Sequence, residues 1–519
     1  MSSLTEPRDD REPLNPALRL YGRRFHKDQT PLEYLAEFLL VFASKKGTNQ
    51  TDSFRFNLDD DTDSLYYWPE DRIALKLFSF FPSSKLSTRH PVHQKAYKEA
   101  IIELKNNIKA SPESKEETVK LLQSLLTGFI GVSGDRTWTT NTFFPASTAL
   151  LAREVDWLHT KAKKAEIKEW GNTGNYFALD RHNFMARGGE VLFLQIVYLF
   201  SPEGQRELNT RLSDRYEYDH LSELRNDLLK NDLETELSEI LLEDVEDLQD
   251  IVDFILKSLR NFTIPGKVLY EDKETRASLG WIPKTCAPEA FLFACELRNI
   301  CKQKIGSFEK LQLLETLCCM QVLRTLCFEA RFKEKPNMKA NGFLGGYSWI
   351  VADPNATTKD GLYKIAQSSF EEIEEMLYRV LRIDENTNEN NLKEADKHGF
   401  KIFRKIAKTI GLVTPKTGSS QRFSLPPQLL RFLVAALVEP GKPVRLTEFY
   451  RRVFAHYGIA LGDKAISTAL LAENNSFEKK NYVVTPDTAW IEEALKQGGL
   501  LIELSDSISI VRNPDHLEI

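Results

Sequence analysis

The sequence lacks the short motifs that identify the commonest enzyme classes. It contains no Walker A sequence, no G-x-G-x-x-G, no H-E-x-x-H and no G-x-S-x-G. Such motifs hold phosphates, dinucleotides, zinc or a catalytic serine. Their absence argues against a P-loop nucleotide hydrolase, a Rossmann enzyme, a zincin and an α/β-hydrolase. It does not argue against a nuclease, whose acidic residues lie scattered along a sequence.

Long apolar runs are also missing. The longest, VLFLQIVYLF from Val191, is about half the length of a membrane span. The polar start, MSSLTEPRDDREPLNP, has no apolar region typical of a secretory signal. Hydrophobic residues at 42% and charged residues at 28% are ordinary for a soluble protein. We therefore expect a cytoplasmic protein with no membrane partner.

Cysteine is scarce and confined to one part of the chain. All six cysteines lie between Cys286 and Cys327, which fits reduced thiols better than a disulfide framework. The stretch from residue 288 to 332 reads as two helices, the first ending at Gly306 and the second capped by Ser307. Only Cys319 and Cys327 share a helical face, two turns apart and too far for one metal ion. The second helix is apolar nearly all round, so we predict a buried core with no metal or cofactor.

Most patterned segments have helical spacing, and 519 residues suggest roughly three domains. The predicted fold class is mainly α (α+β): a multi-domain helical body with a C-terminal winged-helix-like domain. The predicted parts are a flexible arm (1–20), an N-terminal α+β domain (21–205), a helical middle domain with acidic helices and the Cys-rich hairpin (206–385), a linker (386–397) and a basic winged-helix-like C-terminal region (398–519).

Charge is unevenly distributed, although the net charge is only −6. Residues 214–253 hold fifteen Asp or Glu against three Lys or Arg, at the spacing of one or two amphipathic helices. Residues 393–456 hold thirteen Lys or Arg against four Asp or Glu. Such asymmetry indicates a molecule that faces nucleic acid with one end and protein with the other. A solvated helix face is the plainer interpretation of the acidic stretch.

Residues 428–512 show three helices followed by a β ribbon, a pattern that resembles the winged-helix fold. The third helix, DKAISTALL, offers only Lys464, Ser467 and Thr468, so base-specific readout is not expected. Non-specific contact with phosphates and a purely protein-docking domain both remain open. The predicted nucleic-acid-binding residues are Lys401, Arg404, Lys405, Lys408, Lys416, Arg422, Arg445, Arg451, Arg452 and Lys464.

One polar cluster allows for catalysis. The segment GNTGNYFALDRHNFMARGGE holds Asp180, His182 and Glu190, which have the chemistry of acids, bases or metal ligands. A polar structural turn closed by Gly188 and Gly189 explains the same residues.

Two further patterns suit surface loops better than metal sites. DDDTDSLYYWPE has acidic residues at calcium-loop spacing but Ser64 where the sharp turn needs glycine. STRHPVHQ pairs His90 with His93, and no further ligand lies at zinc-finger spacing.

The segments RTWTTNTFFPASTALLAREVDW and NYFALDRHNFMARGGEVLFLQ resemble uncharacterised accessory proteins of bacterial anti-phage defence operons. The resemblance implies a defence-complex subunit and no particular mechanism. We therefore predict a non-enzymatic subunit that docks other protein subunits through its helical body and contacts the DNA or RNA backbone through its basic C-terminal region. Two alternatives stay open: a metal-dependent nuclease or phosphoester hydrolase centred on Asp180, His182 and Glu190, and a purely structural adaptor.

Overall fold

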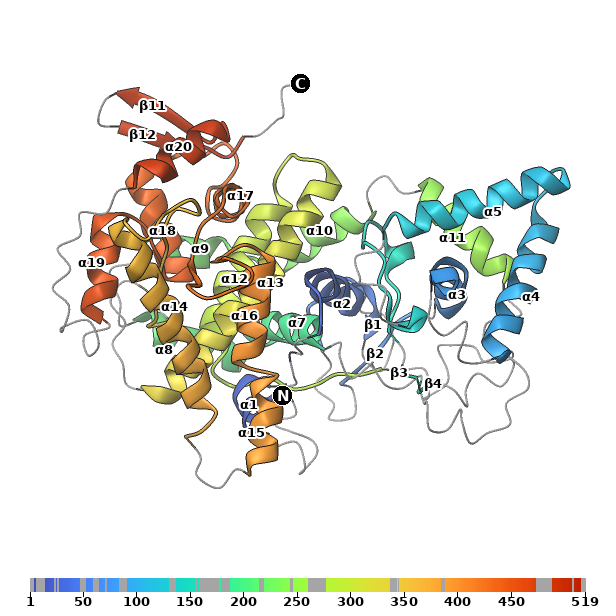
Figure 1. Cartoon of the computed structure of the whole chain (residues 1–519), viewed down its shortest axis with the longest axis horizontal. Helices are drawn as coiled ribbons and strands as arrows, with labels where there is room; N and C mark the ends of the chain where they lie inside the picture. The colour runs from blue at the N-terminus through green and yellow to red at the C-terminus, as the bar shows by residue number, and fades with distance from the viewer. Residues whose placement is uncertain are drawn as a thin grey trace. The chain divides into compact units, whose positions relative to one another are not determined.

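A computed structural model covers the whole chain (Figure 1). The residues that the structure describes are 4–5, 15–22, 25, 28–46, 53–58, 65–70, 72–83, 91–129, 137–154, 156–157, 177–178, 187–213, 219–242, 246–259, 277–336, 343, 345–383, 388–472, 488–505 and 508–514.

The chain forms two compact units, and each is built from separate stretches of sequence. Unit 1 comprises residues 28–193 and 238–280, and unit 2 comprises residues 2–27, 194–237 and 281–519. The described parts are mainly helical, as predicted, and their strands are short. The sequence predicts three consecutive domains. The contacts instead define two units, because segments far apart in sequence pack together in each of them.

Unit 1 is built around α2 and a helical group. Its elements are α2 (Pro31–Ala43), β1 (Lys45–Lys46), β2 (Tyr66–Trp68), α3 (Ile73–Phe80), η3 (Phe81–Ser83), α4 (Pro91–Asn107), α5 (Pro112–Thr127), η5 (Trp138–Thr140), η6 (Thr148–Leu150), β3 (Asp156–Trp157), β4 (Phe177–Ala178), the start of α7 (Gly188–Leu199), the end of α10 (Lys230–Leu242), α11 (Glu246–Ser258) and β5 (Ala277–Ser278). Strands β1, β2 and β5 form an antiparallel sheet in that order.

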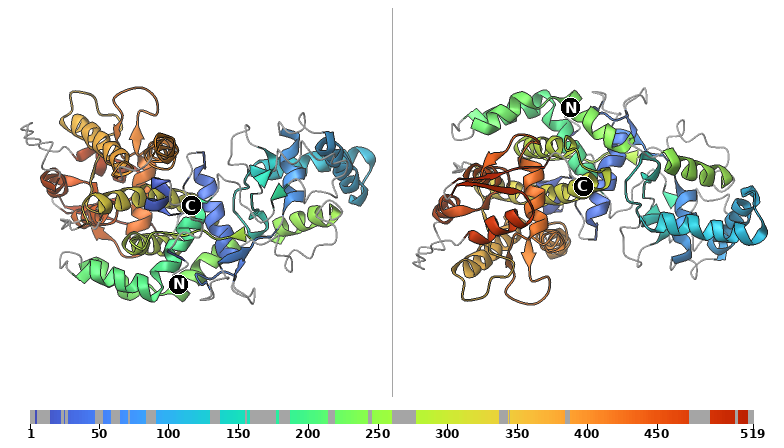
Figure 2. Two further views of the ribbon diagram at one scale, coloured as in Figure 1. Left: turned by 90° about the horizontal axis from the view of Figure 1, so that it is seen from below. Right: turned by 90° about the horizontal axis from the view of Figure 1, so that it is seen from above.

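Two helix starts in unit 1 have side-chain caps. Thr30 and Glu33 form a capping box at α2, and Pro31 occupies the first turn. Ser111 caps α5 in the same way. In both views of Figure 2, α11 lies beside α3, α4 and α5, although it comes much later in the sequence. Apolar residues of α11 such as Val252 and Ile255 are fully buried there.

The glycine pair of the polar cluster brings α7 close to α2. Gly188 N–H donates to Gln29 Oε1 at 3.1 Å, and Gly189 N–H donates to Glu37 Oε2 at 2.8 Å. A methyl group on Gly189 would overlap the backbone of α2 at Tyr34 and Phe38. Glycine is therefore required here by the close approach of two helices, not by a turn.

Unit 2 surrounds a central helical hairpin. Its elements are α1 (Pro16–Tyr21), the rest of α7, α8 (Pro202–Ser213), α9 (Asp219–Asp227), the start of α10, α12 (Ala287–Cys301), α13 (Ser307–Glu334), β6 (Trp349–Ile350), α14 (Gly361–Val380), α15 (Glu389–Asp396), α16 (Phe400–Thr409), β7 (Val413–Thr414), β8 (Arg422–Phe423), α17 (Pro427–Leu437), β9 (Val444–Arg445), α18 (Leu446–Tyr457), β10 (Ile459–Ala460), α19 (Gly462–Ala472), α20 (Ala489–Gln497), β11 (Leu501–Ser505) and β12 (Ile508–Val511).

The hairpin of α12 and α13 is the core of unit 2, as predicted, and all six cysteines are buried thiols. Helix α12 ends at Cys301, earlier than predicted, and Gly306 precedes α13 as its N-cap. By length and composition alone α13 could cross a membrane, but 83% of its most apolar window is buried. That burial is typical of a core helix in a soluble protein.

The C-terminal region belongs to this core and is not a separate domain. Asn299 and Gln303 of α12 each donate to a backbone carbonyl of α17 at 2.8 Å. Strand β6 pairs in parallel with β10. Helix α18 ends before Gly458, which has a φ of +70° that favours glycine.

The predicted arm and linker are also partly folded. Leu4 is buried, and α1 packs against α13 and α15. Within the predicted linker, α15 is fixed by an ion pair between Arg382 and Asp396 at 3.0 Å. The acidic stretch contains α9, α10 and α11, three helices where one or two were predicted, and these fall in different units. In each of these segments, apolar side chains recur within a polar sequence, so each helix can bury one of its faces.

Replacing Gly189 with alanine tests the close approach of α7 to α2. The added methyl group would lie 2.5 Å from Phe38 N, so backbone must move and the free energy of unfolding should fall by about 2–3 kcal/mol. Gly306→Ala is the matched control, because nothing lies within 4 Å of its added methyl group. Urea denaturation followed by circular dichroism measures both variants; equal stabilities would contradict the packing.

Candidate functional site

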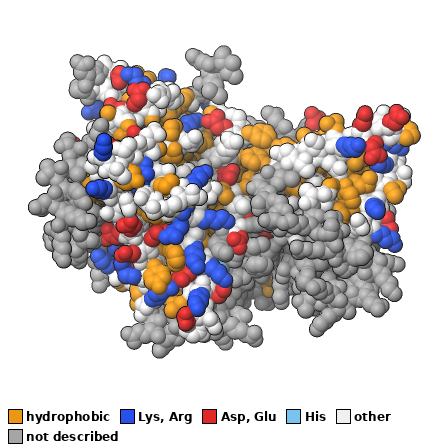
Figure 3. All heavy atoms as spheres, viewed as in Figure 1, with side chains coloured by type: hydrophobic (Ala, Val, Ile, Leu, Met, Phe, Trp, Pro, Cys, Tyr) orange, Lys and Arg blue, Asp and Glu red, His pale blue; other side chains and the backbone are white. Residues whose placement is uncertain are grey.

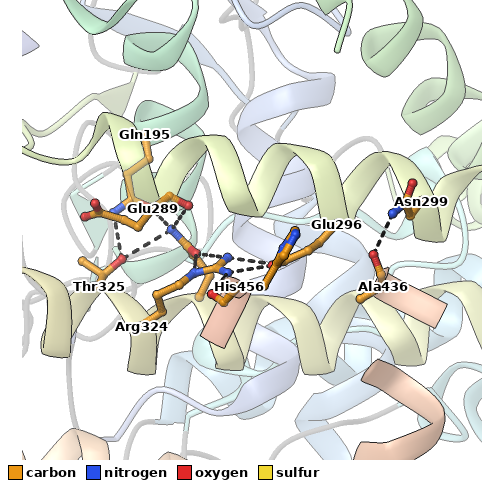
Figure 4. A network of polar contacts seen from close by, with 9 residues as sticks. Gln195, Glu289, Glu296, Asn299, Arg324, Thr325, Ala436 and His456 are labelled. Atoms are coloured by element: carbon orange, nitrogen blue, oxygen red, sulfur yellow. Dashed lines mark hydrogen bonds and ion pairs between the residues drawn. The ribbon is translucent and has the colours of Figure 1, made fainter. Parts of the chain in front are cut away.

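A fully buried ion pair joins the two helices of the hairpin (Figure 4). Arg324 on α13 donates two hydrogen bonds to Glu296 on α12, at 2.7 and 2.8 Å, and both side chains are 0% exposed. His456 Nδ1 on α18 lies 2.8 Å from the same carboxylate. Gln321 accepts from Arg324 and donates to Gln195 on α7 at 2.8 Å. The network links four helices of unit 2.

Burial and charge pairing shift the pKa values of this network in opposite directions. Burial alone would raise the pKa of Glu296, but Arg324 and the hydrogen bond from His456 hold that pKa below its usual value. Burial lowers the pKa of His456 despite its carboxylate partner. The ring of His220 stacks on His456 with centroids 5.6 Å apart, and burial lowers its pKa to about 2. Every acceptor around Arg324 belongs to the protein, so this network stabilises the fold.

A second cluster brings together three carboxyl groups of unit 2: Glu207 on α8, Glu289 on α12 and Glu329 on α13. Burial raises the pKa of Glu207 to about 8 and that of Glu329 to about 7. Burial, followed by the neighbouring Glu329, raises the pKa of Glu289 well above its usual value. Thr285 Oγ1 donates to Glu329 Oε2 at 2.6 Å.

Carboxyl groups that titrate near neutral pH have the chemistry of general acids and bases. The pocket beside Glu329 is lined by Arg211, Arg331 and Lys335, but it encloses only about 40 Å³. That space holds a water molecule rather than a substrate. Among the described residues, no group of three His, Cys, Asp or Glu side chains has the arrangement of a metal site.

Glu190 is the one described residue of the proposed catalytic cluster, and its contacts indicate a structural role. Glu190 is 0% exposed; its Oε1 accepts from the Gly280 backbone N–H and from Arg187 at 3.4 Å. A carboxylate so enclosed has no access to a substrate. Asp180, His182 and His90 lie outside the described residues.

Glu190 acts on its neighbour Glu37 in the same buried region of unit 1. Burial raises the pKa of Glu37 to about 8, and the charge of Glu190 raises it further. Glu37 accepts a hydrogen bond from the backbone at the start of α7, and Glu190 accepts one from the backbone of Gly280.

The ten predicted nucleic-acid-binding residues fall into two groups. Lys401, Arg404, Lys405 and Lys408 lie on α16, next to the β7–β8 hairpin that carries Lys416 and Arg422. Arg445, Arg451, Arg452 and Lys464 lie on β9, α18 and α19.

Several of the arginines are engaged within the fold. Arg422 is 5% exposed and donates to the carbonyls of Pro354 and Ala356, so its predicted contact with phosphate is not supported. Arg404 makes two hydrogen bonds to Glu374, at 2.5 and 2.6 Å. Arg451 and Arg452 both bind Glu448.

The lysines of α16 form a stripe in which Lys401 and Lys405 are exposed and Lys408 is half-buried. Ile402, Phe403, Ile406 and Ala407 bury the opposite side of this helix. Burial, and then the charge of Arg404, lower the pKa of Lys408. Figure 3 shows Lys and Arg side chains gathered over the region of α14, α15 and α16, with hydrophobic and acidic side chains among them. We refer to Lys401, Lys405 and Lys408 as the lysine stripe.

The β ribbon at the end of unit 2 has a different surface. Its sheet has the order β11-β12-β9, so β11 is an edge strand. Ile502, Leu504 and Ile508 are 38%, 61% and 41% exposed. Glu493 on α20 and Glu503 on β11 are exposed nearby in sequence. An apolar, partly acidic edge suits protein better than phosphate.

No protein-family model, curated protein or solved structure matches this chain.

The sequence predictions missed the buried carboxyl groups. Glu289 and Glu296 stand inside the apolar stretch PEAFLFACELRNIC, which could have indicated buried acids that need partners. Nothing in the sequence pairs Glu296 with Arg324, or Glu329 with Glu207, because these residues come from different helices.

The raised pKa of Glu207 predicts a pH-dependent stability. A carboxyl group that binds its proton more tightly when folded stabilises the protein at low pH. That contribution is lost as pH rises from about 4.5 toward 8. Glu207→Gln should flatten this decline, and Glu203→Gln, an exposed change on the same helix, should not. Urea denaturation at several pH values measures the slope; parallel slopes for all three proteins would contradict the assignment.

Proposed function

We propose that the protein is a non-enzymatic cytoplasmic subunit of a larger assembly, which contacts the DNA or RNA backbone non-specifically through the lysine stripe. The observation that carries the proposal is the position of Lys401, Lys405 and Lys408 along one side of α16, where Lys401 and Lys405 are exposed and Lys408 is half-buried. Positions separated by four and three residues lie one above the other on a helix. Such a stripe neutralises successive phosphates without reading bases.

The electrostatics of Lys408 support an anionic ligand. Its pKa is lowered by partial burial and by the neighbouring Arg404. A bound phosphate would relieve this cost, because an opposite charge favours the protonated amine. Lys416 is exposed on the β7–β8 hairpin next to α16 and extends the positive surface. Arg404 contributes less, because Glu374 already neutralises it.

A winged-helix arrangement of the last part of unit 2 belongs to the same proposal. The predicted third helix corresponds to α19, and α20 follows it before the ribbon. The arrangement is supported by helices α17, α18 and α20 together with the sheet order β11-β12-β9. The helix before the ribbon, α20, carries Glu492 and Glu493, which would repel phosphates. We therefore assign this part to protein docking, with Ile502 and Leu504 at its edge strand.

The resemblance to accessory proteins of anti-phage defence operons remains a prediction about the assembly. The nuclease alternative retains no support from Glu190, which is enclosed. The purely structural adaptor differs from our proposal only in lacking nucleic acid, so binding experiments separate the two.

The lysine stripe is tested with the triple variant Lys401→Gln, Lys405→Gln and Lys408→Gln. Glutamine keeps the helix propensity while removing charge. Fluorescence anisotropy with labelled double-stranded DNA and single-stranded RNA measures affinity as salt is varied. We expect the slope of log K against log salt to decrease by about 2–3, since each phosphate contact contributes about 0.7–0.9.

A matched control removes the same charge elsewhere. Lys98, Lys109 and Lys120 are exposed on or next to α4 and α5 of unit 1, and their replacement by glutamine should leave the slope unchanged. Equal slopes for the two triple variants would refute the stripe. Absence of binding by the native chain at low salt would leave only the adaptor.

The docking surface is tested with Ile502→Lys and Leu504→Lys together. Charges on an edge strand block pairing and apolar contact. Proteins that co-purify with the tagged chain from its native source should be lost, as identified by mass spectrometry, while affinity for nucleic acid stays unchanged. Leu121→Lys, at a position 69% exposed on α5, is the control. A native chain that purifies as a lone monomer would oppose the subunit proposal.

A further inference from the structure

Unit 1 contains a hollow of about 380 Å³. This volume lies within the range of roughly 300–1,000 Å³ that is typical of small-molecule sites. Its walls come from the end of α2, from β1 and β2, from η6 and from α10 and α11, all in the same unit. The residues that the argument uses are Lys45, Phe54, Trp68, Glu70, Arg72 and Gln249.

Arg72 lines this hollow, and one of its donors has no hydrogen-bond partner among the described residues. Its side chain is 6% exposed, and its Nη2 donates to Glu70 and to the carbonyl of Thr148 at 3.3 Å. Its Nε is buried and has no hydrogen-bond partner among the described residues. A buried donor without an acceptor is costly, so Arg72 gains from an acceptor that its side chain can reach by a small shift. Glu70 is 56% exposed, so an anionic ligand can compete with it for Arg72.

Phe54 supplies an aromatic ring from an unusual backbone conformation. Its φ is +58°, in the left-handed region that aromatic residues rarely adopt. The Phe54 N–H donates to Phe42 O at 2.9 Å, and the two rings meet edge to face with centroids 5.8 Å apart. Backbone strain that is held in place by neighbours is concentrated at ligand sites. Trp68 of β2 adds a second ring to the lining.

We propose that this hollow binds a small ligand in which a planar ring carries a phosphate or carboxylate group. The ring packs against Phe54 and Trp68, and the anionic group takes the place of Glu70 as an acceptor for the Arg72 guanidinium. Lys45 is a second cation on the lining of the hollow. Gln249 also lines the hollow, and its Nε2 donates to Asp253 at 2.8 Å. The site is independent of the lysine stripe on α16.

Isothermal titration calorimetry on the full chain tests the proposal with two anionic ring compounds. Adenosine monophosphate represents the phosphates and indole-3-acetate the carboxylates. We expect at least one to bind with a Kd below about 100 µM. Adenosine, which lacks the anion, and inorganic phosphate, which lacks the ring, should bind at least about tenfold weaker. The compound that binds identifies the source of the anion. If neither binds, or if adenosine or phosphate binds equally well, the proposal is wrong.

Two variants locate the binding. Phe54→Asn removes the ring but suits the positive φ, because asparagine tolerates that conformation. Lys45→Gln removes a charge at an exposed position. We expect Kd to rise about tenfold or more for Phe54→Asn and severalfold for Lys45→Gln, with unchanged circular dichroism. Lys120→Gln on α5 should bind like the native chain. Unchanged binding in both pocket variants would overturn the assignment.

Discussion

The buried pair of Arg324 and Glu296 is the interaction on which unit 2 depends. Both side chains are 0% exposed, and their two hydrogen bonds join the helices of the central hairpin. Removing one partner would leave an unpaired charge at a cost of about 3–5 kcal/mol. The carbonyl of His456 also accepts from Arg324, so the pair holds α18 as well as α12 and α13. The C-terminal region is therefore anchored to the core by charge as well as by apolar packing.

The need to pair a buried charge also distinguishes charges that hold segments of the fold together from charges at the surface. Glu190 and Arg422 are enclosed and have partners in the protein, so they position segments of chain. The lysines of α16 lie on the side opposite its apolar face, two of them exposed and Lys408 half-buried. Arg72 is buried in the same way and, like Arg422, keeps its Nε without a hydrogen-bond partner, but it also lines a hollow. This difference underlies both proposals, since a surface stripe suits a long polyanion and a buried donor suits a small one.

Local features of the fold could be predicted from the sequence. Thr30 and Ser111 cap helices because their side chains reach backbone N–H groups a few residues away. The cysteine hairpin was predicted to be core because its second helix is apolar nearly all round, and it is buried. The sequence also predicts the basic, amphipathic character of α16. It predicts neither the Arg324 partners nor the hollow beside Phe54, since their residues come from separate elements.

The sequence by itself determined which segments are helices, where several of them begin, and which helix presents lysines. Hydrogen bonds between near neighbours and the spacing of apolar residues decide these properties. The tertiary structure alone decided that residues 28–193 and 238–280 form one unit, that the predicted arm and linker contribute α1 and α15, and that Arg422 is enclosed. Such outcomes depend on which apolar faces bury one another across long separations in sequence, and periodicity within one segment contains no information about its partner.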